Sequence, residues 1–393
     1  MADRARGLSK NTVLLAATSL FADISTEMLY PILPVFLTQT LRASGSIVGL
    51  IDGLAQAVQN VVQGVSGSVS DRLRKRKPLA AAGYLLSALA KPLMGLAPSW
   101  PALLGGRLLD RVGAGSRSAP RDALIASSVD EADRGRAFGL EGLGDNAGAF
   151  LGPVISLLLV NFVHVALRTI FYLAVIPGLL AFLVTLAVKE GSAAAARSGI
   201  GLSAARFPRG YWRYLGVTVL FTLGNSSNAF LILRTRDSGI ALDRTILIYA
   251  AFNLAAAFIS YPAGVLSDRV GRRNVLLGAL AIFFVSYLGF AISENALLIA
   301  GLFVGYGLFQ GMFRAVGKAL AADSVPEELR ASGIGWYSAT VGVVQLVASL
   351  VGGQLWDRVG HAATFYYGAA FAAVGAVALL LTPVRDRPSS AHS

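Results

Sequence analysis

Residues 264–273 read GVLSDRVGRR, and residues 67–76 read GSVSDRLRKR. Each stretch joins two long apolar blocks, and Asp71 and Asp268 are 197 residues apart. The same offset relates Arg117 to Arg314, so the likeness extends beyond the two loops. Two related halves built from hydrophobic helices are the design of a secondary transporter, in which the substrate site lies where the halves meet.

The composition places this repeat in a membrane. The chain has 393 residues, of which 55% are hydrophobic and 14% charged, and its mean hydropathy is +0.62. Soluble domains contain roughly 25% charged residues. The apolar residues form blocks near the ~20 residues that a helix needs to cross a bilayer. Alternating ~10-residue segments, which would indicate a membrane barrel, are not visible.

The apolar blocks predict twelve membrane-spanning helices. The first six lie near 12–38, 45–70, 77–97, 101–128, 134–160 and 166–188. The second six lie near 211–234, 243–267, 273–292, 296–322, 328–357 and 362–383. Residues 189–210 form the one long internal linker. We therefore expect an N-terminal six-helix bundle at 1–188, a cytoplasmic linker at 189–210 and a C-terminal six-helix bundle at 211–393.

The basic residues predict the orientation. Of the 34 Lys and Arg residues, 21 fall at the N-terminus or in segments on the same side of the membrane. Six fall in the opposite loops: Arg42, Arg168, Arg234, Arg236, Arg244 and Arg358. Cytoplasmic segments carry the excess of Lys and Arg, so both termini are expected in the cytoplasm. The formal charge of +12 is then a topology signal and not a sign of nucleic-acid binding.

Several kinds of chemistry are disfavoured. There is no cysteine, and the three histidines fall in predicted loops or the tail, so no metal site and no cofactor is expected. No Gly-x4-Gly-Lys-Ser/Thr loop for ATP is present. A membrane enzyme would have only carboxylate chemistry, and a channel would not need two repeated loops. We therefore expect a protein that is not an enzyme.

Fourteen ionisable residues fall inside the predicted spans. Each costs at least ~2.5–3.5 kcal/mol on insertion scales and is a functional-site hypothesis. The basic ones are Lys91, Arg107, Arg111, Arg117, Arg121, Arg314 and Lys318. The acidic ones are Asp23, Glu27, Asp52, Asp110, Asp122, Glu141 and Asp145. Seven of each sign indicate mutual pairing in the bundle interior.

The fourth span carries the clearest pattern. At about 100° per residue its six charges occupy a stripe of about 140° on one helix face. Such a stripe fits either a ladder of ion pairs or the lining of an aqueous cavity. Arg117, nearest the middle, is the candidate for substrate or coupling, and Arg314 lies at the matching position of the second half. The residues expected to form structural ion pairs are Arg107, Asp110, Arg111, Arg121 and Asp122.

The first span places Asp23, Glu27 and Tyr30 on one helical face. Two carboxylates one turn apart repel each other when both are ionised, which suits a proton-coupling site. Pairing with the arginines of the fourth span is an equal alternative, and competition between proton and arginine would combine the two. Asp145 in the fifth span is the third coupling candidate, while Glu141 lies nearer the cytoplasm as an ion-pair partner.

Polar residues also mark the walls of the predicted cavity. Asp52 and Gln56 lie on one face of the second span, and Asn225 and Asn228 lie in the seventh. The residues expected to line the cavity are Tyr30, Asp52, Gln56, Arg117, Glu141, Asn225, Asn228, Gln310, Arg314 and Lys318. Polar walls with few buried aromatic residues favour a polar or charged solute.

With these motifs the chain resembles the major facilitator superfamily of secondary transporters. Its second loop copy has the pattern Gly-x-x-x-Asp-Arg-x-Gly-Arg-Arg in full, whereas the first has Arg74 at the second glycine. The fourth span is similar to the family's arginine motif but has Arg111 where glycine is common. The fifth span is similar to an antiporter motif but has Ser156 at its last glycine position. The loop residues that match are Gly67, Asp71, Arg72, Gly264, Asp268, Arg269, Gly271, Arg272 and Arg273, and the small residues of the fifth span are Gly144, Gly148, Gly152 and Pro153.

The resemblance implies alternating access, with the loops as gates and proton antiport as the energy source. We expect a monomer in the plasma membrane, the inner membrane in a bacterium, that exports a small solute in exchange for protons. The alternative is import or exchange of a small anion between Arg117 and Arg314, because paired arginines suit phosphate or carboxylate groups.

Overall fold

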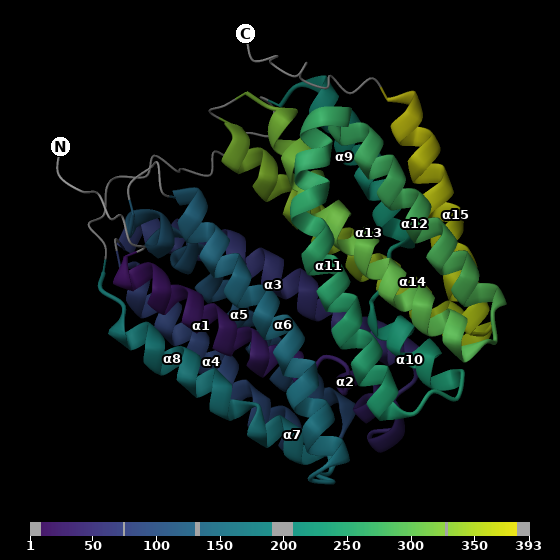
Figure 1. The fold of residues 1–393 in the computed structure, drawn as a ribbon, viewed down its shortest axis with the longest axis horizontal. Helices are drawn as coiled ribbons and strands as arrows, with labels where there is room; N and C mark the ends of the chain where they lie inside the picture. Colours follow the sequence, from purple (N-terminus) through teal and green to yellow (C-terminus); the bar gives the residue numbers. More distant parts are fainter. Residues whose placement is uncertain (1–8, 74, 130–133, 191–206, 327–328, 383–393) are drawn as a thin grey trace. The chain divides into compact units, whose positions relative to one another are not determined.

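The computed structural model describes residues 9–73, 75–129, 134–190, 207–326 and 329–382. Over these residues the chain is all-helical and holds no β-strand (Figure 1). The first half contains α1 (Lys10–Glu27), α2 (Leu33–Val35), the π-helix η1 (Phe36–Thr40), α3 (Gly45–Leu73), α4 (Arg76–Leu96), α5 (Trp100–Ser127), α6 (Arg134–Asn161), α7 (Leu167–Leu173) and α8 (Val175–Ala187). The second half contains α9 (Arg209–Gly224), α10 (Ala229–Asp237), α11 (Leu242–Val270), α12 (Arg272–Ile292), α13 (Ala296–Asp323), α14 (Arg330–Arg358) and α15 (His361–Leu381).

These helices fall on the predicted apolar blocks to within a few residues. Three predicted spans are divided: the first into α1, α2 and η1, the sixth into α7 and α8, and the seventh into α9 and α10. Nine helical segments of the described chain are long and apolar enough to cross a membrane. The three remaining predicted spans begin at α1, α3 and α5 and are not among these nine. These helices contain more polar and charged residues. The full count of twelve crossings and the orientation of the termini stay predictions.

The chain divides into two compact units that interleave along the sequence. Unit 1 comprises residues 1–30 and 61–199, and unit 2 comprises residues 31–60 and 200–393. Helix α3 is therefore continuous in the backbone but contributes its first half to unit 2 and its second half to unit 1. Most of the predicted linker, residues 191–206, lies outside the described residues.

Unit 1 is held together by helices that approach closely at small residues. Helix α1 packs on α6 and α8, and α4 packs on α5 and α8. A Cβ added at Gly83 would lie 2.7 Å from the carbonyl oxygen of Gly113, so α4 and α5 meet backbone to backbone. Because lipid provides no hydrophobic driving force between helices, such close approach supplies the packing energy.

Unit 2 has a core of aromatic rings, which the sequence analysis did not expect. Helix α12 packs on α13 and α15, and α11 packs on α13. The rings of Phe221, Phe283 and Phe309 contact one another edge to face, with centroids 4.9 to 5.6 Å apart. The expectation of few buried aromatic residues is wrong here, because residues scattered over α9, α12 and α13 converge in space.

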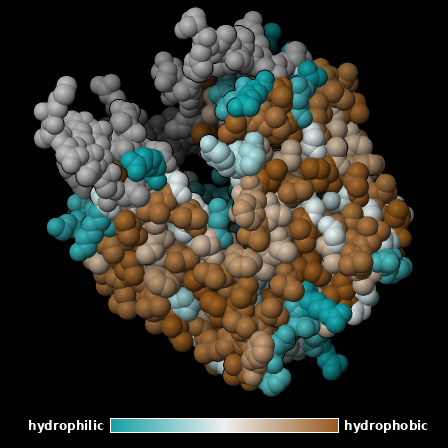
Figure 2. All heavy atoms as spheres, viewed as in Figure 1, coloured by the Kyte–Doolittle hydropathy of each residue, from teal (hydrophilic) through white to brown (hydrophobic). Residues whose placement is uncertain are grey.

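The outer surface suits a bilayer. Large apolar side chains are exposed, among them Tyr261 at 81% and Leu297 at 83%. The face drawn in Figure 2 is mainly hydrophobic, with hydrophilic residues in separate patches. In water a surface of this kind would associate or aggregate, whereas lipid covers it without cost.

Five of the six arginines predicted in the opposite loops lie in helices: Arg168 in α7, Arg234 and Arg236 in α10, Arg244 in α11 and Arg358 in α14. Arg234 lies within α10 and is 1% exposed. Its Nε donates to the carbonyl oxygen of Phe290 at 3.1 Å, and an Nη atom donates to that of Ser293. The guanidinium therefore caps the end of α12, where carbonyl groups have no partner within the helix. The assignment of Arg234 to a loop is wrong because α10 runs on through Asp237.

Candidate functional site

Arg121 on α5 is the ionic centre of unit 1. Its Nη2 lies 2.9 Å from Oε1 of Glu141 and 3.0 Å from Oδ1 of Asp122, and its Nη1 lies 3.7 Å from Oδ1 of Asp145. Nη1 also donates to Ser19 Oγ at 3.0 Å, and that hydroxyl donates to Glu141 at 3.1 Å. Three carboxylates share one guanidinium, so protonation of any one of them redistributes the remaining contacts.

Two carboxylates of α1 lie beside this centre. Asp23 and Glu27 are half-buried on α1. A Cβ added at Gly148 would lie 2.7 Å from Cβ of Asp23, and one at Gly152 would lie 2.8 Å from Cβ of Glu27. The glycines of α6 thus bring its backbone against both acidic residues. Asp145, Arg117, Glu27 and Arg121 act on Asp23 electrostatically.

A second buried cluster surrounds Asp110, which is 1% exposed. Its Oδ2 accepts from Arg111 Nη2 at 2.5 Å and from Arg107 Nη1 at 3.4 Å. Its Oδ1 accepts from Ser87 Oγ at 2.5 Å and lies 3.3 Å from Lys91 Nζ. Lys91 and Ser87 come from α4, so this cluster ties α4 to α5. The sequence pattern indicated the arginines but assigned no role to Lys91.

Arg117 contacts an aromatic ring that the sequence analysis missed. Its guanidinium carbon lies 4.5 Å from the ring centroid of Tyr84 on α4, and both side chains are buried. A desolvated cation over an aromatic face is stabilised by about 2 kcal/mol. The Tyr84 hydroxyl has no hydrogen-bond partner within the described chain. A single tyrosine in the run LAAAGYLLSALA carries no pattern that could have indicated it.

In unit 2 the predicted seventh span is broken at its polar residues. Helix α9 ends at Gly224 and α10 begins at Ala229, so the segment 225–228 leaves the helical hydrogen-bond ladder. The hydroxyl of Tyr306 lies 3.2 Å from Asn225 Oδ1 and 3.1 Å from Asn228 Oδ1. Asn228 Nδ2 donates to Gln310 Oε1 at 3.4 Å. Discontinuous helices of this kind commonly form solute sites in transporters.

Asp52 is bound to the same break. Ser227 Oγ donates to Asp52 Oδ2 at 2.6 Å and accepts from the backbone N–H of Ala229 at 3.0 Å. The carboxylate, 8% exposed, therefore lies at the N-terminus of α10, where the helix dipole favours negative charge. This contact attaches the first half of α3 to the broken span.

The start of α3 is also fixed to α14. Asp357 accepts from the backbone N–H groups of Gly45 and Ser46, both at 2.8 Å, and from Ser46 Oγ at 2.5 Å. A Cβ added at Gly49 would lie 2.2 Å from the carbonyl oxygen of Ser349. The carboxylate satisfies orphan N–H groups of α3, as a capping residue does. Sequence reasoning missed Asp357 because its partners are more than 300 residues away.

The second loop motif spans the junction of α11 and α12, and Gly271 is its one residue outside these two helices. Gly271 has φ of 90°, a conformation that an L side chain rarely adopts. Arg272 Nε donates to Asp323 Oδ2 at 2.5 Å, and its Nη2 lies 3.2 Å from Asp268 Oδ1. Arg273 donates to a backbone carbonyl of α15. The motif thus links α11, α12 and α13 at one end of unit 2.

Other predicted site residues take less defined places. Gln56 and Tyr30 are half-buried, and Arg314 and Lys318 on α13 are exposed. Gly264 has open space where a Cβ would lie, and Arg269 is exposed. Pro153 lies inside α6. In the first loop motif, the side chains of Asp71 and Arg72 and the environment of Gly67 lie outside the described residues.

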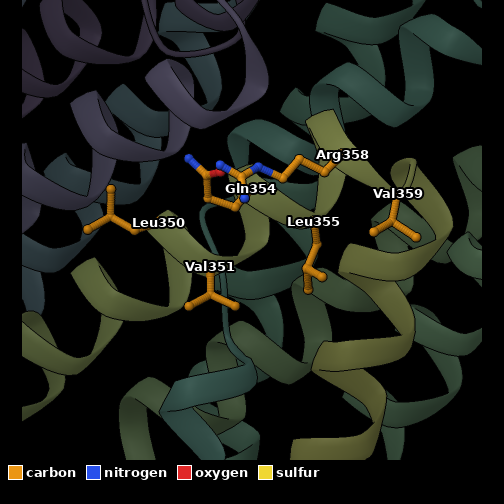
Figure 3. A pocket seen from close by; sticks show the side chains of 6 residues that line it. All are labelled: Leu350, Val351, Gln354, Leu355, Arg358 and Val359. Carbon is orange, nitrogen blue, oxygen red and sulfur yellow. The ribbon is translucent and has the colours of Figure 1, made fainter.

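A shallow hollow lies along the second half of α14 (Figure 3). Its lining consists of Leu350, Val351, Gln354, Leu355, Arg358 and Val359. The side chains of Gln354 and Arg358 lie beside each other, and the others are apolar. Since one helix supplies the whole lining, the hollow lacks the converging polar groups of a solute site.

An all-helical chain with an apolar exterior and ion clusters in its interior has the construction of a polytopic membrane protein. The sequence model of the Major Facilitator Superfamily matches residues 15–233 and 214–393. The chain belongs to this family. It is a transporter of a small molecule and not an enzyme.

Relatives support the assignment over the whole length. The chain is 35% identical over 384 residues to an uncharacterized MFS-type transporter of Methanocaldococcus jannaschii, covering 95% of each chain. It is 30% identical over 341 residues to a probable 4-methylmuconolactone transporter of Cupriavidus pinatubonensis, covering 83% of this chain and 79% of that one.

Solved structures agree on the fold. The nucleoside transporter NupG superposes with a TM-score of 0.81 at 14% identity, covering 95% of this chain and 100% of that chain. A peptide transporter, POT, superposes with a TM-score of 0.79 at 14% identity, covering 96% of each chain. At such identity the likeness concerns the fold alone.

Proposed function

We propose that the chain is a proton-coupled secondary transporter that exports a small solute by alternating access. The observation that carries this proposal is the sharing of Arg121 among Glu141, Asp122 and Asp145, with Asp23 in the same electrostatic field. Each carboxylate competes with its neighbours for one guanidinium. A proton that neutralises one of them releases the arginine toward another, which couples protonation to a rearrangement of α1, α5 and α6.

The contacts of α3 support alternating access. Its first half is attached to unit 2 by hydrogen bonds from neutral donors to Asp52 and Asp357, whereas its second half belongs to unit 1. These hydrogen bonds join the first half of the sequence to the second, and contacts that break and reform are needed wherever two halves rock about a central site. Hydrogen bonds between a carboxylate and neutral groups suit such a role, since either side can be rehydrated without separating a buried ion pair.

The proposal includes the remaining expectations from the sequence. Both termini lie in the cytoplasm, the protein acts as a monomer, and it resides in the plasma membrane, the inner membrane of a bacterium. The substrate is a small solute, and the residues that we expect to bind it include Arg117 of unit 1 and the polar break at 225–228 of unit 2. Nucleosides, peptides and 4-methylmuconolactone, which the relatives and structural neighbours carry by name, are the first solutes to test.

The test uses purified protein in liposomes that enclose a pH-sensitive dye. We expect one solute class to trigger a proton flux with the wild type. Asp23→Asn should reduce that flux at least tenfold, because the amide keeps the shape of the side chain but binds no proton. Glu27→Gln and Asp145→Asn should do the same. Asp243→Asn, at the first turn of α11, is the matched control and should transport like the wild type.

Other results of this experiment would favour a different mechanism. Labelled solute that enters without any proton movement would contradict proton coupling. Saturable uptake of an anion, lost in Arg117→Gln and Arg314→Gln, would then support the alternative of an anion importer or exchanger. If Asp23→Asn alone retained full proton flux, Asp23 would be an ion-pair partner and not a coupling residue.

A further inference from the structure

Tyr84 is placed between the apolar core of unit 1 and its charged centre. The side chain is 1% exposed, and its ring packs in the core with Leu15, Ala22 and Ala181. Its hydroxyl is buried and has no hydrogen-bond partner within the described residues. A buried hydroxyl without a partner lowers stability relative to a phenylalanine of the same shape. Packing alone therefore does not explain why this position has a tyrosine and not a phenylalanine.

The surroundings of the hydroxyl suggest an explanation. The guanidinium carbon of Arg117 lies 4.5 Å from the centroid of the Tyr84 ring. Arg121, Asp145 and Asp23 act on Tyr84 electrostatically as well. A guanidinium can only donate hydrogen bonds and a carboxylate can only accept them. A phenolic hydroxyl does both, so it alone among these groups can accept from an arginine while donating to an aspartate.

We propose that the Tyr84 hydroxyl is a hydrogen-bonding member of the coupling site, which joins the arginines of α5 to the carboxylates of α1 and α6. When Arg121 turns from one carboxylate to another, the hydroxyl donates to the aspartate that has lost its guanidinium and stabilises its ionised form. No proton leaves the tyrosine. This inference rests on the proposed function for the roles of Asp23 and Asp145.

The ring and the hydroxyl have separable roles. The ring stabilises the Arg117 guanidinium through the cation–π contact at 4.5 Å. The close approach of Gly83 and Gly113 holds the backbone of α4 next to Tyr84 against α5. Phenylalanine would keep the ring and the contact with Arg117 but remove the hydroxyl. Leucine would remove both. The two variants together distinguish a positioning role from a hydrogen-bonding role.

The other charged groups on the helices packed around this site have their own partners. The packed helices are α1, α5, α6, α7 and α8. Their other charged residues, together with Lys91 of α4, include Glu27, Arg107, Asp110, Arg111, Asp122, Glu141 and Arg168. Lys91 is bound to Asp110, and both Asp122 and Glu141 are bound to Arg121. Arg168 donates to the carbonyl oxygen of Gly95. The titration of Asp23 and Asp145 is thus the property that the hydroxyl should alter.

The experiment follows protons directly and needs no known solute. Purified full-length protein is titrated in detergent while infrared difference spectra record the C=O band of protonated carboxyl groups. Asp23→Asn and Asp145→Asn assign the part of the band due to these residues. We expect Tyr84→Phe to move the midpoint of that part to higher pH by about one unit, because a donor to the ionised form has been removed. Tyr84→Leu should move it as well and also weaken solute binding.

The control is Tyr211→Phe, which removes a buried hydroxyl that donates to the carbonyl oxygen of Gly333 at 2.7 Å. It should leave the titration unchanged and lower the melting temperature. An unchanged midpoint in Tyr84→Phe, with a raised melting temperature, would overturn the proposal and leave Tyr84 as a packing residue. A wild type without solute-driven proton flux would instead overturn the proposed function, and the infrared midpoint would still decide the link to Tyr84.

Discussion

A single carboxylate organises the buried charge between α4 and α5. Asp110 accepts from Lys91, Arg107 and Arg111, and all four side chains are largely shielded from solvent. Burying a charge is costly unless a partner and hydrogen bonds compensate for lost hydration. The cluster therefore adds little net stability compared with an apolar core, yet each member depends strongly on the others.

This dependence predicts that Asp110→Asn is severely destabilising. The change removes the carboxylate that three cations share, and breaking a buried ion pair costs about 3–5 kcal/mol. Thermal unfolding in detergent, followed by circular dichroism, should show a clearly lower midpoint. Adding Lys91→Met to this variant should restore part of the lost stability, since one of the buried cations that lack a counter-charge has been removed. A single variant as stable as the wild type would show that the cations have other sufficient counter-charges.

At the scale of elements, glycines set the distance between α1 and α6. Added Cβ atoms at Gly144, Gly148 and Gly152 would each lie within 2.8 Å of α1 atoms. Their spacing of four residues places them in one row along α6. The row sets the distance between α1, which carries Asp23, and α6, which carries Asp145. The packing of these two helices therefore determines the geometry of the proposed coupling site.

Gly148→Ala should therefore impair both stability and coupling. Its Cβ would lie 2.7 Å from the carbonyl oxygen of Leu20 as well as from Asp23, and overpacking of this kind costs about 1–3 kcal/mol. Proton flux in liposomes should fall several-fold because α1 is pushed away from α6. Gly142→Ala is the control in the same helix, since open space surrounds its Cβ and alanine favours the helix. Equal behaviour of the two variants would contradict the packing argument.

At the scale of the whole molecule, the distribution of positive charge predicts the orientation of the chain in the membrane. Because the chain contains no cysteine, single cysteines can report this without background labelling. We expect Ser44→Cys to react in intact cells with a membrane-impermeant maleimide. Ala2→Cys and Ser393→Cys should react only after the membrane is permeabilised. Labelling of either terminus from outside would reverse the orientation and with it the direction of the proposed export.

How much of the molecule could be predicted differs from one scale to another. Long apolar blocks located the helices, because the bilayer requires a minimum apolar length whatever the tertiary contacts. The charge stripe of α5 placed Arg107 and Asp110 on one face, because helical periodicity alone fixes that. The role of Lys91 was not assigned, and Tyr84 and Asp357 were not found. Their roles depend on which helices become neighbours, and the sequence of one helix does not contain that information.

Two errors have the same origin. Hydropathy shows only where the sequence becomes polar. A polar residue near the end of a helix, such as Arg234 in α10, is therefore assigned to a loop. Aromatic residues such as Phe221 and Phe283 are scattered along the chain and come together only in the folded unit 2. Both features are set by packing between segments distant in sequence.

The division of α3 between the two units has a consequence for biosynthesis. The ribosome delivers residues 31–60 to the membrane well before Ser227 and α14, which supply the partners of Asp52 and Gly49. During that interval Asp52 has neither Ser227 nor the N-terminus of α10 beside it. The first half of the chain must therefore be held in an incomplete state by the insertion machinery or by lipid until synthesis is nearly finished. Maturation of the first half thus depends on translation of the second.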